Sequence, residues 1–136
     1  MQIKSAKGST TLELGHTERL RPGGALTYLH VLIHGPVEAA ARVYDDHFEA
    51  LTEYFRDLAG HWRGWSGTKK WESLEGHVRL QASADRTGHI TLRVRLRDDA
   101  AGDDWSVETA LVLEAGQLAA IADGVARHLG AQAGAA

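Results

Sequence analysis

The 136-residue sequence predicts an α+β fold, a twisted antiparallel sheet of about six to seven strands with two helices packed on one face. Two observations support this fold class. Apolar and polar residues alternate along residues 77–84 and 89–97, as they do in strands with one buried face. Apolar residues recur instead every three or four positions along residues 48–62 and 118–129, which is the period of an amphipathic helix.

The first part of the chain contains two or three strands. Residues 9–14 and 27–34 have strand patterns, and both faces of the second segment are partly apolar, which predicts a strand covered on both sides. Residues 37–44 either pair back as a further strand or form a helix, which their alanines favour. The preceding Gly-Pro turn permits either structure, and we expect the strand.

The first helix is expected to begin near Asp46, because Asp46 and Glu49 have the spacing of a capping box. Gly60 is placed to end this helix in a left-handed cap. The second helix follows the last strand, and its apolar stripe predicts that it runs from Leu118 to Gly130. The stripe of the first helix consists of Phe48, Leu51, Phe55, Leu58 and Trp62.

A meander of strands lies between the helices. Strands over residues 77–84 and 89–97 are joined by a turn at residues 85–88, and a polar loop over residues 98–104 leads to a strand over residues 105–113. Each of these strands has one apolar and one polar face. The sheet should therefore be covered on one side and in contact with water on the other.

These elements predict one domain over residues 1–129, followed by a flexible Gly/Ala tail over residues 130–136. The net charge of −3 argues against a nucleic acid or an anionic membrane as partner, since both require a basic surface. No apolar run approaches the roughly 18 residues of a membrane helix. The absence of cysteine excludes disulfides, thiolate zinc sites and a cysteine nucleophile, and it fits a cytoplasmic protein.

Four short motifs lie at residues 62–67, 71–76, 88–89 and 113–118. Together they resemble an uncharacterised family of small bacterial domains of unknown function, over roughly residues 45–130. The Trp-Arg-Gly-Trp stretch is the most specific motif, because tryptophan is rare and the spacing is tight. The resemblance implies one compact domain, and it supplies no activity and no catalytic residue.

Three tryptophans and a lysine surround the turn after the first helix. We interpret Trp62 as the end of the helix stripe and Trp71 as part of the core edge. Trp65 lies between two glycines, and the sequence leaves open whether it caps the core or forms a recognition surface. Trp65 and Lys69 are therefore candidate binding residues.

Arginines gather on the water-facing side of the meander. Arg79 lies on one strand, and Arg93, Arg95 and Arg97 lie on the next with the same orientation. Such a stripe could bind a carboxylate, a phosphate or an acidic protein surface. It could equally be a solvated face with cross-strand ion pairs, for example to Glu108. Arg79, Arg93 and Arg95 are the candidate binding residues here.

The sequence predicts no metal site and no cofactor. His30 and His34 lie on one face of a strand, and whether they meet another histidine in space is open, whereas a metal needs three or four converging ligands. No catalytic constellation is visible either. Glu72 and Glu75 are an odd number of residues apart and should face opposite ways, and no nucleophile elbow is present. We therefore lean against an enzyme.

The leading hypothesis is a non-enzymatic binding module that binds another protein, of the immunity or adaptor type. One alternative is a small-molecule-binding domain or small enzyme, with a pocket between sheet and helix lined by Tyr28, His30 and His34. The other alternative is a structural homodimer.

Overall fold

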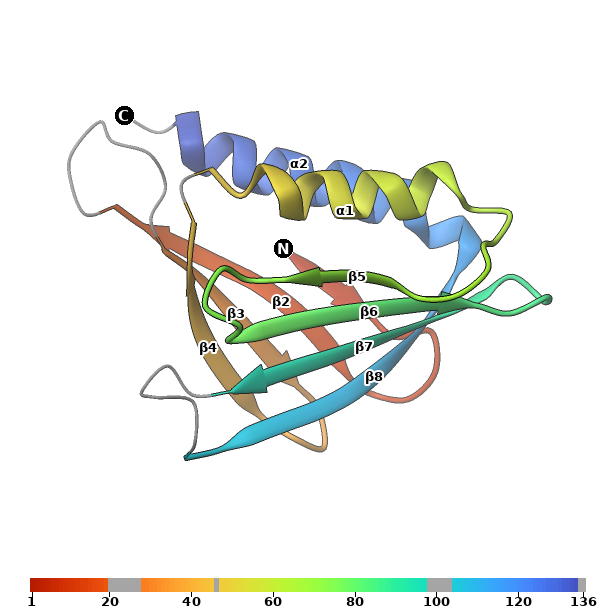
Figure 1. The fold of residues 1–136 in the computed structure, drawn as a ribbon, viewed down its shortest axis with the longest axis horizontal. Coiled ribbons are helices and arrows are strands. Elements are labelled where there is room, and N and C mark those ends of the chain that lie inside the picture. Colours follow the sequence, from red (N-terminus) through yellow and green to blue (C-terminus); the bar gives the residue numbers. More distant parts are fainter. Residues whose placement is uncertain (20–27, 46, 98–103, 135–136) are drawn as a thin grey trace.

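The computed structural model describes residues 1–19, 28–45, 47–97 and 104–134, the last four of these as backbone alone. The fold is α+β with two helices and two antiparallel sheets of four strands each. Figure 1 shows both helices running along the same side of the two sheets. The predicted fold class is confirmed, but the single sheet of six to seven strands is wrong.

The first sheet has the order β1-β2-β3-β4 and is built from the N-terminal third of the chain. Leucine, valine and isoleucine occupy alternate positions of β2 and β3. One face of these strands is therefore apolar and points into the core. The opposite face of β3 is only half-buried, so the expected cover on both sides is wrong. The strands are β1 (Gln2–Lys4), β2 (Thr11–Glu18), β3 (Tyr28–His34) and β4 (Ala39–Tyr44).

The second sheet has the order β5-β6-β7-β8 and confirms the predicted meander. Alternation places Leu80, Leu92, Val94 and Leu111 in the core and the polar side chains on the other face. The polar loop expected at residues 98–104 lies mostly outside the described residues. The strands are β5 (Lys69–Glu72), β6 (Val78–Ala84), β7 (His89–Arg97) and β8 (Ser106–Glu114).

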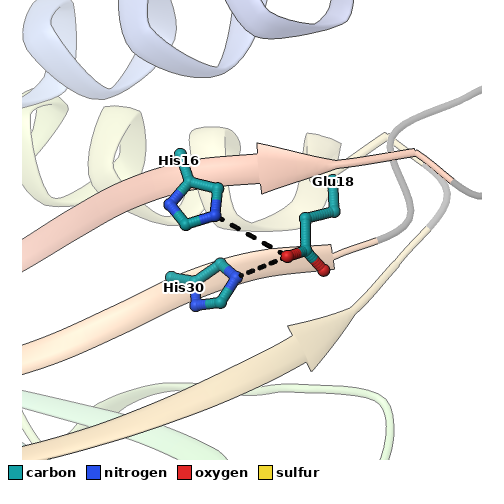
Figure 2. A group of neighbouring side chains, drawn as sticks. All are labelled: His16, Glu18 and His30. Atoms are coloured by element: carbon teal, nitrogen blue, oxygen red, sulfur yellow. Dashed lines mark hydrogen bonds and ion pairs between the residues drawn. The ribbon is translucent and has the colours of Figure 1, made fainter.

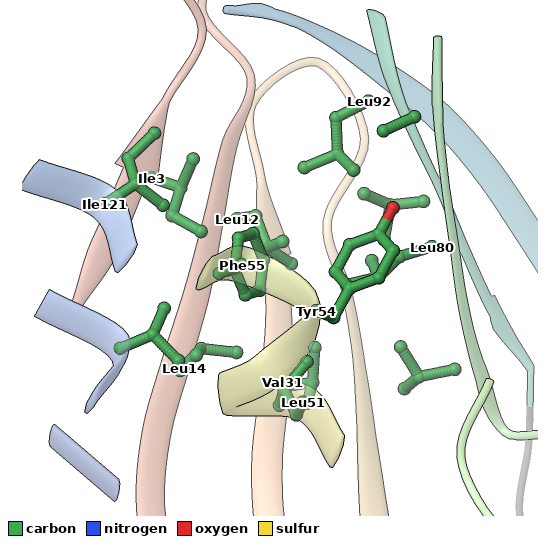
Figure 3. Close-up of a cluster of buried hydrophobic side chains, with 14 of the residues drawn as sticks. Ile3, Leu12, Leu14, Val31, Leu51, Tyr54, Phe55, Leu80, Leu92 and Ile121 are labelled. Atoms are coloured by element: carbon green, nitrogen blue, oxygen red, sulfur yellow. The ribbon is translucent and has the colours of Figure 1, made fainter. Parts of the chain in front are cut away.

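One apolar core lies between the sheets and the helices. Helix α1 (Glu49–Gly60) contributes Leu51, Phe55 and Leu58, and Figure 3 shows Phe55 among side chains from both sheets and from α2. A 3-10 turn, η1 (Ala115–Gln117), leads into α2 (Leu118–Gly134). Helix α2 thus continues past Gly130, where its apolar stripe ends.

The start of α1 differs from the expected capping box. Its N-cap is Phe48, which makes no side-chain cap bond and has a left-handed backbone with φ of 56°. Burial of the phenyl ring in the core stabilises this uncommon conformation, since Phe48 is fully buried. Asp46 lies outside the described residues.

The expected left-handed cap at Gly60 is also wrong, because α1 ends with hydrogen bonds from the His61 amide to the carbonyls of Asp57 and Leu58.

The two sheets are tied together where β1 approaches β8. The Ala6 amide donates to the Val112 carbonyl at 2.7 Å, and the Val112 amide donates to the Ser5 hydroxyl at 2.9 Å. The Gln117 side chain also donates to the Lys4 carbonyl, at 3.3 Å. The polypeptide that leaves β1 therefore satisfies backbone groups on the edge strand of the second sheet.

Candidate functional site

The outward face of the second sheet carries the predicted arginines in two cross-strand rows. The first row reads Glu72, Arg79, Arg95 and Glu108 across the four strands. The Arg95 guanidinium lies 3.4 Å from Glu72, and that of Arg79 lies 3.8 Å from Glu108. Two cations and two carboxylates therefore balance within this row.

The second row, which we call the cationic row, reads Lys70, Gln81, Arg93 and Ala110. It contains two cations and no carboxylate. Lys70 and Arg93 are both exposed, and neither makes an ion pair with another residue of the described chain. The positive charges of Lys70 and Arg93 are therefore not neutralised within the cationic row.

Arg95 and Arg97 also hold the connection between β5 and β6. Arg97 donates to the Glu75 carbonyl at 3.1 Å, and Arg95 lies 3.5 Å from the Gly76 carbonyl. A Cβ at Gly76 would lie 2.6 Å from the Arg97 guanidinium, and Gly76 also has a φ of 79°. Only glycine fits this close contact without a shift of the arginine. Arg95 and Arg97 are therefore largely occupied by local structure.

Trp65 and Lys69 do not join the arginines, because they lie on the side of β5 and β6 that faces α1. The Lys69 ammonium is 2.9 Å from Asp57 of α1 and 5.7 Å from the Trp65 ring centre. The Trp65 indole donates to the Ala82 carbonyl at 3.2 Å, and its ring packs against the core. The Tyr54 hydroxyl donates to the Lys69 carbonyl, and burial raises the pKa of Tyr54.

The other two tryptophans of this region have different environments. Trp71 faces inward on β5, opposite Leu80, and packs against the core as expected. Trp62 is 53% exposed, so its assignment to the buried helix stripe is wrong. Helix α1 ends at Gly60, and Trp62 therefore no longer follows the helical period.

An open hollow of about 520 Å³ lies beside Trp65. Arg63 and Arg86 contribute cationic side chains to its wall. At the adjacent β6–β7 turn, hydrogen bonds from Thr87 and from the His89 amide lower the pKa of Asp85 to about 2. The exposed part of Trp65 therefore borders an open hollow with charged and polar side chains in its wall.

Tyr28, His30 and His34 lie on the outward face of the first sheet, away from the core. Their side chains do not face the space between sheet and helix, because the inward positions of β3 are occupied by Leu29, Val31 and Ile33. Tyr28 does border a hollow of about 170 Å³ at the margin of the two sheets. The rest of its lining consists of Arg42, Tyr44, Glu75 and His77.

His34 is bound by two carboxylates at opposite ring nitrogens. Its Nε2 lies 2.7 Å from Glu13, and its Nδ1 lies 3.0 Å from Glu38. The hydrogen bonds to Glu13 and then to Glu38 raise the pKa of His34. Because the two carboxylates approach opposite sides of the ring, they do not converge on one point.

His16, Glu18 and His30 do converge, as Figure 2 shows. The Oε1 atom of Glu18 lies 3.3 Å from Nε2 of His30 and 3.7 Å from Nε2 of His16. The hydrogen bond to His30 lowers the pKa of Glu18, so this carboxylate is ionised near neutral pH. His16 and Glu18 were not identified from the sequence, although the isolated Gly15 in this strand was a possible signal of a bulge.

The sequence of the chain matches a family of unknown function, DUF6228, over residues 4–132. The chain belongs to this family. The match confirms the resemblance to an uncharacterised domain family and extends it to the first sheet, beyond the expected limits of 45–130. No curated protein and no solved structure matched the chain. Neither helix of the described chain has the length and apolarity that a bilayer crossing requires.

Proposed function

We propose that the protein is a non-enzymatic binding module, of the adaptor or immunity type, whose second sheet binds an acidic surface of another protein. The observation that carries this proposal is the cationic row. Lys70 and Arg93 project from alternate strands of the sheet with only the uncharged Gln81 between them. A carboxylate-rich surface would supply the opposite charge that the row lacks.

The surroundings of the cationic row favour a broad partner over a small ligand. Ala110 at the end of the cationic row and Ser83 beside the row are small and exposed, so this part of the face offers no wall that would enclose a small molecule. The chain as a whole carries a net charge of −3, and the outward face of the first sheet contains Glu13 and Glu18. Positive charge on the second sheet is therefore a local feature, which would orient an approaching acidic partner.

Binding to an acidic probe tests this proposal. A fluorescent poly-glutamate peptide is titrated with the protein at low salt, and binding is measured by fluorescence anisotropy. We expect wild type to bind, and we expect Arg93→Gln and Lys70→Gln each to lower the affinity by up to about fivefold, the effect of one exposed ion pair. Added salt should weaken the wild-type interaction because screening acts on exposed charges.

Arg86→Gln is the matched control, because it removes the same charge from the exposed β6–β7 turn. Equal weakening by Arg86→Gln, or no binding by wild type, would show that the cationic row is not a binding site. Light scattering on the same samples distinguishes a partner site from a homodimer. A dimer that is disrupted by Arg93→Gln would identify the face as a self-association surface instead.

A further inference from the structure

A β-bulge in β2 changes which side chains reach the outward face of the first sheet. Leu14 pairs with Val31 and Thr17 pairs with Leu29, so both Gly15 and His16 lie opposite His30. In a regular strand, alternation would turn His16 and Glu18 inward, to the same side as Leu14. The extra residue reverses this order and places both side chains beside His30 on the outward face.

Two contacts fix the bulge. A Cβ at Gly15 would lie 3.2 Å from the Leu32 side chain and 3.3 Å from the His30 carbonyl, so the close approach of the strands favours glycine. The Nε2 atom of His128 on α2 donates to the Gly15 carbonyl at 2.7 Å. The helix thereby holds the backbone that orients His16.

We propose that His16, Glu18 and His30 bind a divalent transition-metal ion, with zinc the best chemical match. Imidazole nitrogen and carboxylate oxygen are zinc ligands, with bonds of about 2.0–2.2 Å. A tetrahedral ion with such bonds separates neighbouring ligand atoms by about 3.3–3.6 Å. The distances of 3.3 and 3.7 Å from Glu18 Oε1 to the two histidine nitrogens are close to this spacing.

Arg42 positions the carboxylate of this group. Its guanidinium lies 3.4 Å from Oε2 of Glu18 and 4.4 Å from the centre of the Tyr28 ring. Oε2 is therefore directed toward Arg42, while Oε1 faces the two histidines. Such outer partners orient a metal ligand and limit it to one coordinating oxygen.

Metal binding requires one local movement. The His16 and His30 rings are stacked with centres 4.0 Å apart and planes at 21°, so the lone pairs of their nitrogens lie in two separate, nearly parallel planes. The rings must open relative to each other for both nitrogens to reach one ion. His16 can supply this rotation, because its side chain is 68% exposed. With three protein ligands in the described chain, water would complete the tetrahedron.

Calorimetric titration with Zn²⁺ tests the proposal, using protein free of any affinity tag in a non-coordinating buffer at pH 7.5. We expect wild type to bind one equivalent. His16→Gln, His30→Gln and Glu18→Gln should each weaken binding at least about tenfold, since each removes a ligand and even outer partners contribute that much. Co²⁺ should give the visible absorption of a tetrahedral site, which is lost in the same variants.

His34→Gln is the matched control, because His34 lies on the same strand face with carboxylates that do not converge. His16→Gln changes an exposed side chain and should retain the wild-type circular dichroism spectrum. Absence of Zn²⁺ binding by wild type would overturn the proposal. An equal loss of Zn²⁺ affinity in His34→Gln, or an unchanged Zn²⁺ affinity in all three ligand variants, would also overturn it. The outcome is independent of the poly-glutamate titration, which probes the other sheet.

Discussion

At the scale of single residues, His34 is the histidine of the described chain whose pKa is clearly shifted by its neighbours. Hydrogen bonds to Glu13 and Glu38 stabilise its protonated form, and its pKa is raised above the ordinary value of 6.5. A group that binds its proton more tightly in the folded state stabilises that state fully below the unfolded pKa. This stabilisation is lost as the pH rises through the folded pKa.

We therefore expect the NMR titration of the His34 ring to have a midpoint above pH 6.5. The pH dependence of the unfolding free energy should include a decline above pH 6.5 that disappears in His34→Gln. Glu13→Gln should move the midpoint back toward 6.5, because Glu13 makes the stronger of the two hydrogen bonds. A wild-type midpoint at or below 6.5 would contradict this account.

The environments of individual tryptophans were only partly predictable. Trp71 follows a strand period, and its inward position was correct. Trp62 was misplaced because a helical period describes a side chain only as far as the helix continues, and α1 ends two residues earlier. Trp65 both caps the core and contributes to the surface. Its indole donates a hydrogen bond to a core strand, and its ring borders an open hollow.

At the scale of elements, the bulge in β2 is the feature with the largest effect on surface chemistry. The Gly15→Ala variant tests how strongly the bulge depends on glycine at this position. The new methyl group would press on Leu32 and on the His30 backbone, and we expect a loss of about 1–3 kcal/mol in the free energy of unfolding. Urea denaturation measures this loss, and NMR should show altered His16 and His30 ring signals.

Gly60→Ala is the control for this substitution. An added Cβ at Gly60 meets nothing within 4 Å, and Gly60 is the last residue of α1. Alanine there should leave stability unchanged or raise it by up to about 1 kcal/mol. Equal destabilisation by both variants would mean that the close approach at the bulge is not the cause.

The strands and helices themselves were largely predictable, and the bulge was not. Segments 77–84, 89–97 and 105–113 agree with β6, β7 and β8 to within about one residue, because alternation and turns coincide. Residues 37–44 contain a strand, as preferred. The strand predicted at 9–14 continues to Glu18, and its apparent end arose because the bulge reverses the alternation after Leu14.

At the scale of the whole molecule, hydrogen bonds at Ser5 and Val112 link the two sheets, and we expect stability to depend on them. Ser5→Ala would leave the part-buried Val112 amide without its 2.9 Å acceptor. We expect a loss of about 1–3 kcal/mol, the cost of an unsatisfied buried polar group. Urea denaturation measures the loss, and hydrogen exchange at the Val112 amide should become faster.

Ser83→Ala is the control, because Ser83 is exposed on the outward face of β6. It should change the free energy of unfolding by less than about 0.5 kcal/mol. A Ser5→Ala protein as stable as this control would show that the sheets do not depend on the Ser5 bond.

The division into two sheets was not predictable from the pattern of residues. Alternation tells which face of a strand is buried, but it does not tell which strand is its neighbour. Helix α1 separates β4 from β5 in the sequence, and either a continuous sheet or two sheets would bury the same stripes. The short strand β1, of three residues, offered too little pattern to detect.

The bond between His128 and Gly15 joins residues 113 positions apart, and the Ser5–Val112 bond spans 107. A chain emerging from the ribosome exposes β2 long before α2 exists. Contacts of such high sequence separation form late, because closing the intervening loop costs entropy first. We therefore expect the first sheet to pair early with its bulge incompletely held. The orientation of His16 toward Glu18 and His30 is then a product of the last step of folding, the docking of the C-terminal helix.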